Sequence, residues 1–236
     1  MGRGPSIEGR KNAEDAKRAK VFTKLIRDIT LAARNGADPA GNAKLRTACD
    51  KALAANMPKD KIEKAIRRGS GADGGADLQE VRYEGYGPGG VALIIDTLTD
   101  NPVRTVAEVR HALSKNGGNL GTSGSVAFQF ARTGQISIPA SSADEDRVME
   151  VALDAGADDV FSEGESIVVL CPPDAVDAVE QALRAAGLAV DNAEVAMRPA
   201  NRSAVSGEAA DDLRDLIEWL EELDDVQDVF HNAEFR

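Results

Sequence analysis

The stretch that decides the fold class opens with Gln135-Ile136-Ser137-Ile138-Pro139 and runs to residue 199. Its first five residues alternate as a strand does, and apolar residues at helical spacing follow. After that strand, the pattern predicts a helix over 144–155, strands over 159–161 and 166–171, a helix over 173–186 and a strand over 193–198. This order of strand, helix, strand, strand, helix and strand is typical of the ferredoxin-like arrangement.

The segments on either side of this stretch predict another α+β domain. They hold strand-like runs at 80–86, 91–98 and 125–131, a helix from 102 to about 115, an acidic amphipathic helix at 208–223 and a strand at 226–230. The last helix and strand would complete the sheet that begins at residue 80. We therefore predict a discontinuous ferredoxin-like domain over 78–132 and 205–236, with a second ferredoxin-like domain, 133–204, inserted into it.

The first 72 residues read as a domain of three helices. In the first helix, Phe22, Ile26 and Ile29 belong to one narrow apolar stripe when the chain turns about 100° per residue. A second helix is expected over 41–55, and a third has Pro58 in its first turn and ends at Gly69. The Gly-rich residues that follow read as a linker, so the expected fold class is α+β with an N-terminal three-helix domain and two α+β domains.

Charge is distributed unevenly along the chain. Residues 1–72 contain 17 Lys and Arg against 8 Asp and Glu, a net charge of +9. The whole chain carries −12, so residues 73–236 carry −21. A basic segment on an otherwise acidic chain indicates a polyanionic partner.

The placement of the cations predicts which of them would contact nucleic acid. On the first helix, lysines and arginines fall opposite the apolar stripe, and on the third helix they recur at i, i+3 and i+7. The candidate contact residues are Arg10, Lys11, Lys17, Arg18, Lys20, Lys24, Arg27, Lys61, Lys64 and Arg68. The alternative is a solvated surface on which Lys serves only solubility.

Other motifs do not support catalysis or metal binding. Residues 85–90 match G-x-G-x-x-G by letter but lead into a strand, whereas a dinucleotide site needs a helix there. His111 and His231 have no Cys or His neighbour at ligand spacing. We expect no enzyme activity, no cofactor, no metal and no small-molecule substrate. The Gly-rich residues 115–125 are either a mobile connection or a loop that approaches phosphate or a partner.

Composition also limits the compartment. The chain has no run of about 18 apolar residues, so no membrane span is expected. Cys49 and Cys171 are far apart in sequence and each lies in an apolar pattern. Free buried thiols fit a reducing cytoplasm.

Several motifs together resemble the YebC/PmpR family in order over nearly the whole chain. They include Asp15-Ala16-Lys17-Arg18, Phe22-Thr23-Lys24-Leu25-Ile26-Arg27, Asn56-Met57-Pro58-Lys59-Asp60, Tyr83-Glu84-Gly85-Tyr86-Gly87-Pro88-Gly89-Gly90 and Thr99-Asp100-Asn101-Pro102-Val103-Arg104-Thr105. One departure is Gly2-Arg3-Gly4-Pro5, where many members carry Gly-His-Ser-Lys-Trp. If that segment touches nucleic acid, the contacts of this chain differ there.

The resemblance implies a helical domain followed by two α+β domains, one inserted in the other. It also implies a cytoplasmic bacterial regulator that binds DNA and acts on transcription. Because mitochondrial relatives activate translation and some bacterial relatives are linked to the ribosome, the alternative is an RNA- or ribosome-associated translation factor or translational activator. An enzyme with a site between the α+β domains is a third possibility, for which the residues offer no catalytic group.

Overall fold

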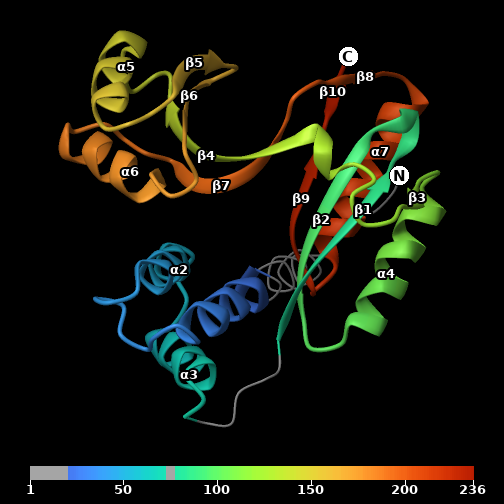
Figure 1. Ribbon diagram of the computed structural model, residues 1–236, viewed down its shortest axis with the longest axis horizontal. Helices are drawn as coiled ribbons and strands as arrows, with labels where there is room; N and C mark the ends of the chain where they lie inside the picture. The colour runs from blue at the N-terminus through green and yellow to red at the C-terminus, as the bar shows by residue number, and fades with distance from the viewer. Residues whose placement is uncertain (1–20, 73–77) are drawn as a thin grey trace, which may run out of the picture. The chain divides into compact units, whose positions relative to one another are not determined.

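The computed structural model describes residues 21–72 and 78–236 and divides into two compact units (Figure 1). The first unit contains the chain up to Ser123 together with Val205–Val229 and Phe235–Arg236. The second contains Gly124–Ala204 and Phe230–Glu234. The predicted α+β class is confirmed, because the N-terminal helices are followed by sheets with helices packed on them.

The helical part of the first unit comprises a helix over residues 21–33, α2 (Ala43–Ala54) and α3 (Lys59–Gly69). Ile29 and Leu45 are fully buried in its core, which is mostly aliphatic. Asn42 caps α2 by accepting a hydrogen bond from the Leu45 amide, and its own amide donates to the carbonyls of Ala32 and Gly36. The cap therefore also ties the end of the first helix to the start of the second.

Gly69 permits a close approach between α3 and the first helix. A Cβ at this position would overlap the Thr30 carbonyl oxygen and lie 2.8 Å from the Ala33 Cβ. Backbone cannot move aside as a flexible side chain can. The glycine therefore allows α3 to pack closely against the first helix, with its other side facing away from that helix.

We expect Gly69→Ala to lower the free energy of unfolding by about 1–3 kcal/mol, because overlap with the backbone outweighs the gain of up to about 1 kcal/mol in helix propensity. Urea unfolding followed by circular dichroism measures the change. Gly41→Ala is the control, since its nearest neighbour would be 3.9 Å away. Equal stability of Gly69→Ala and the wild type would contradict the close approach.

The sheet of the first unit has the strand order β3-β1-β2-β9. Its strands are β1 (Gln79–Tyr86), β2 (Ala92–Thr99), β3 (Asn119–Leu120) and β9 (Val226–His231). The predicted hairpin is confirmed: β1 and β2 pair antiparallel from Gln79↔Thr99 to Tyr86↔Ala92. A short 3-10 turn, η1 (Pro88–Gly90), joins them with Gly89 and Gly90 at positive φ.

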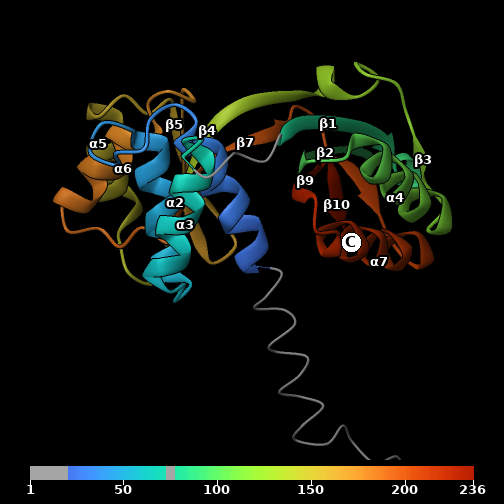
Figure 2. The same ribbon diagram turned by 90° about the horizontal axis from the view of Figure 1, so that it is seen from below.

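Two helices cover one side of this sheet, α4 (Pro102–Lys115) and α7 (Glu208–Glu222), as Figure 2 shows. The buried residues of α7 are Ala210, Leu213, Leu216 and Leu220. Thus β9, from the end of the chain, extends the sheet that β1 and β2 began, as the sequence predicts. Two strands of three residues each, β8 (Ser203–Val205) and β10 (Ala233–Phe235), pair separately.

The second unit has the ferredoxin-like element order that the sequence predicts. Its elements are β4 (Phe130–Pro139), α5 (Glu145–Asp154), β5 (Asp159–Glu163), β6 (Ser166–Cys171), α6 (Val176–Ala185) and β7 (Asn192–Pro199). The strands form an antiparallel sheet in the order β5-β6-β4-β7. Ile136, Val169 and Leu183 are fully buried in the core between sheet and helices.

The predicted strand over Ser125–Ala131 is wrong. A 3-10 turn, η2 (Ala127–Gln129), occupies the middle of this segment, and β4 begins only at Phe130. The Gln129 amide donates to the Val126 carbonyl and closes the turn. Val126 is buried and Phe128 is 78% exposed, so the apolar spacing that resembled a strand does not describe one buried face.

Candidate nucleic-acid interface

One side of α3 presents three of the predicted cations to solvent. Ile62 and Ala65 are buried on an adjoining side of the helix, whereas Lys61, Lys64 and Arg68 are exposed. Their i, i+3 and i+7 positions fall within about 60° around the helix axis. Within the described part of the chain, none of the three forms an ion pair. Lys61 Nζ lies 5.5 Å from the centre of the Phe22 ring, a cation–π contact that steadies it.

Further exposed cations on α2 and α3 were missed by the sequence interpretation. They are Lys44, Arg46, Lys51, Lys59 and Arg67. Residues 43–69 hold eight Lys and Arg against three Asp and Glu, a net +5. The missed signal was this excess itself, because the prediction named no cation on the second helix and only the cations at i, i+3 and i+7 on the third.

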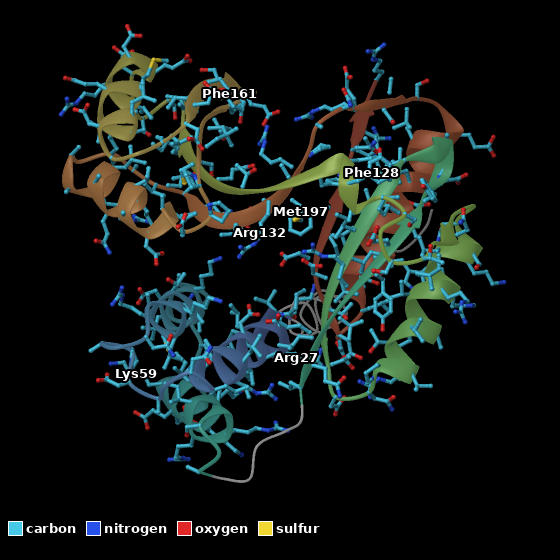
Figure 3. The ribbon with its side chains drawn as sticks, in the orientation of Figure 1. Arg27, Lys59, Phe128, Arg132, Phe161 and Met197 are labelled. Atoms are coloured by element: carbon cyan, nitrogen blue, oxygen red, sulfur yellow. The ribbon has the colours of Figure 1, made fainter. Side chains whose placement is uncertain are left out.

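Two other predicted cations, Lys24 and Arg27, face a different environment. They contact residues 221–225, which we call the α7–β9 corner because they lead from one element to the other. Lys24 Nζ donates to the Glu221 carbonyl oxygen at 2.7 Å, and Arg27 Nη1 donates to the Asp224 carbonyl oxygen. The Arg27 side chain is only 17% exposed. Figure 3 shows Arg27 and Lys59 on opposite sides of the helical part.

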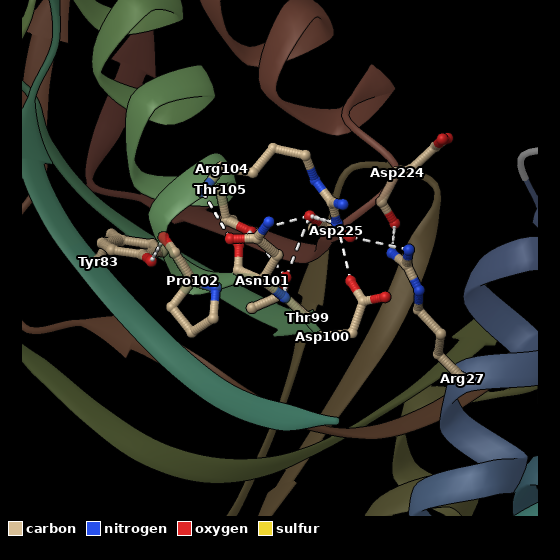
Figure 4. A network of polar contacts seen from close by, with 10 residues as sticks. All are labelled: Arg27, Tyr83, Thr99, Asp100, Asn101, Pro102, Arg104, Thr105, Asp224 and Asp225. Atoms are coloured by element: carbon tan, nitrogen blue, oxygen red, sulfur yellow. Dashed lines mark hydrogen bonds and ion pairs between the residues drawn. The ribbon is translucent and has the colours of Figure 1, made fainter. Parts of the chain in front are cut away.

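Asp225 anchors this corner in a network of donors (Figure 4). Its Oδ1 lies 2.8 Å from Arg27 Nη2, an ion-pair distance without hydrogen-bond geometry. Its Oδ2 accepts from Arg104 Nη2 at 2.8 Å, Thr105 Oγ1 at 2.8 Å and Thr99 Oγ1 at 3.2 Å. The Asp225 side chain is 2% exposed. This carboxylate therefore joins the first helix, β2 and the start of α4.

The charge state of Asp225 follows from these partners. Burial alone would raise its pKa, but hydrogen bonds from Arg104 and Thr105 and the positive charges of Arg27 and Arg104 outweigh burial, so its pKa is lowered from 3.8. The same hydrogen bond raises the pKa of Arg104. Both groups are thus charged at neutral pH.

Gln227, on β9 next to the corner, adds a further contact with the first helix. Its Nε2 donates to Asp28 Oδ1 at 2.5 Å and lies 3.4 Å from the Lys24 carbonyl oxygen. One turn of the first helix, with Lys24, Arg27 and Asp28, is therefore held to the corner and to the start of β9.

The remaining predicted contact residues, Arg10, Lys11, Lys17, Arg18 and Lys20, lie outside the described residues. The five described ones form two groups, one on α3 and one at the corner. In residues 21–72 and 78–236, no group of three or more His, Cys, Asp or Glu side chains is arranged to hold a metal ion. Over the same ranges, no helix is long and apolar enough to cross a membrane.

Comparison with known proteins places these features in a family. Residues 4–72 match the model of the TACO1/YebC protein N-terminal domain, and residues 78–233 match that of the TACO1/YebC second and third domain. A "Probable transcriptional regulatory protein" of Xanthomonas oryzae pv. oryzae is 58% identical over 99% of this chain and 98% of its own length. A protein of the same description from Stenotrophomonas maltophilia is 57% identical, covering 99% and 97%.

A solved structure shares the fold. The crystal structure of a conserved hypothetical protein, Aq1575 from Aquifex aeolicus, superposes with a TM-score of 0.86. The two chains are 42% identical, and the match covers 94% of this chain and 92% of the other.

Proposed function

Because this chain belongs to the TACO1/YebC family, we propose that it is a non-enzymatic regulator that binds nucleic acid through its helical N-terminal part. The exposed Lys61, Lys64 and Arg68 on α3 carry this proposal. The name shared by its relatives, "Probable transcriptional regulatory protein", supports DNA as the polymer and transcription as the process.

In this proposal the helical part binds the phosphate backbone. Lysine and arginine contacts to phosphate release counterions and supply affinity, but they carry little sequence information. The acidic remainder of the chain, at −21 over residues 73–236, repels the same polymer and limits contact to the basic part. No cofactor or substrate takes part.

A second candidate function is an RNA- or ribosome-associated translation factor. The observation that favours it is the composition of α3, which contains no Asn or Gln. These are the side chains that read adenine in the major groove of DNA. The exposed Lys and Arg of α3, which lie beside Asp60 and Glu63, suit the phosphate backbone of a structured RNA, which is recognised without readout in the major groove.

We expect the affinity of the intact chain for its polymer to fall steeply with salt. If about six cations contact phosphates, log K against log salt has a slope near −5 on duplex DNA. Fluorescence anisotropy with a 20-base-pair duplex and with an RNA hairpin, each from 50 to 300 mM KCl, gives the slope and the preferred polymer. A flat response on both would contradict phosphate contacts. Tighter binding to the hairpin, with salt-sensitive cosedimentation with ribosomes, would select the second function.

A further inference from the structure

The C-terminal end of α7 lacks a cation of its own. Its last turn contains no Lys, Arg or His, and Glu221 and Glu222 occupy its final positions. The free carbonyls at a helix C-terminus carry a partial negative charge that basic side chains normally offset. Here Lys24 and Arg27, from a helix nearly 200 residues earlier, approach that end instead.

The oxygens that meet these two cations include both neutral and anionic acceptors. They are two main-chain carbonyl oxygens, of Glu221 and Asp224, and the carboxylate of Asp225. A phosphodiester likewise offers anionic oxygens to Lys and Arg at hydrogen-bond distance. The corner and a nucleic-acid phosphate are therefore alternative acceptors for the Lys24 and Arg27 side chains.

Because both partners would use the same two side chains, we infer that the α7–β9 corner regulates the interface by competing with nucleic-acid phosphate for Lys24 and Arg27. The inference rests on the proposed function. With the first helix docked on the corner, the cations of α2 and α3 bind phosphate but Lys24 and Arg27 do not. When the first helix leaves the corner, two more cations join the interface and affinity rises.

The cost of releasing Arg27 is limited because Asp225 keeps other partners. Arg104, Thr105 and Thr99 still donate to its Oδ2, so the buried carboxylate loses the ion pair at Oδ1 but keeps these hydrogen bonds. Stranding a buried charge would otherwise oppose the release strongly. Because the hydrogen bonds to Asp225 Oδ2 persist, the contact between the corner and the first helix can break and form again.

A disulfide between Asp28→Cys and Gln227→Cys would lock the docked state, since these two side chains are in direct contact. With a 20-base-pair DNA duplex or an RNA hairpin as probe, we expect the oxidised protein to bind roughly tenfold more weakly than the same protein after reduction. Its salt slope should be smaller by about 2, because two cations are withheld. The reduced protein is the matched control. If the disulfide does not close, a short bismaleimide makes the link and the unlinked protein is the control.

A second pair of substitutions tests which side chains are withheld. Lys24→Gln with Arg27→Gln should weaken binding in the reduced protein and change nothing in the locked one. Equal affinity and slope for the locked and reduced proteins would overturn the inference. In that case, weaker binding of Lys64→Gln with Arg68→Gln would leave the proposed function standing. If neither form binds either polymer, both proposals fail.

Discussion

Replacing Lys61, Lys64 and Arg68 together by Gln is expected to weaken nucleic-acid binding by roughly 10²- to 10³-fold at 0.1 M salt. Each phosphate contact contributes about 0.9 logarithmic units per decade of salt, so three contacts remove close to 3 units from the slope as well. The side chains lie on the exposed side of α3, so the fold should persist. Fluorescence anisotropy gives the affinity and slope, and circular dichroism verifies the helices.

A control with the same change in net charge separates the α3 surface from a general electrostatic effect. Arg147, Arg184 and Arg214 each form an ion pair within one turn of α5, α6 or α7. Their joint replacement by Gln should alter affinity only a few-fold. An equal loss from both triple variants would show that net charge, rather than the α3 surface, determines binding.

Asp225→Ala is expected to destabilise the first unit by about 3–5 kcal/mol. The substitution leaves two arginines and two threonine hydroxyls without the buried carboxylate that pairs with them, and breaking a buried charge pair typically costs this much. Trp219, the only tryptophan in the sequence, lies on α7 against His111 and reports on this unit. Its fluorescence during urea unfolding measures the loss.

Asp224→Ala is the matched control, because Asp224 is exposed and its recorded bond to Arg27 uses only the main-chain carbonyl. It should change stability by less than about 0.5 kcal/mol.

The contribution of Asp225 to stability depends on pH. Since the pKa of Asp225 is lowered from 3.8 on folding, its charge stabilises the native state above that value, and this contribution is lost as the pH falls below it. If the difference in free energy of unfolding between wild type and Asp225→Asn became larger as the pH fell, the network would be contradicted.

The order of secondary structure was predictable because the elements are regular. Apolar residues at helical spacing located α4 within a residue of its ends, and Gly87 to Gly90 located the hairpin. The strands β3, β8 and β10 were not predicted, since two or three residues are too few to show a period. The error at Ser125–Ala131 has a related cause: three apolar residues at alternate positions mimic a strand wherever a turn happens to space them so.

The candidate site was predictable only in part. Helical periodicity correctly placed Lys24 and Arg27 opposite the apolar stripe, but it could not show that this second face also has a protein partner. That partner is 197 residues away in sequence, and no residue pattern in the first helix indicates it. The one available signal was in α7, whose final turn has no basic residue to offset its dipole.

The insertion of one α+β unit into another has a consequence for synthesis. The inserted sheet has all its strands once residue 199 has been made, whereas the surrounding sheet receives β9 only with residues 226–231. Domains generally fold as units while the chain grows. The inner unit can therefore complete its sheet first, whereas the hairpin of β1 and β2 has neither α7 nor β9 to pack against until the last residues of the chain are available.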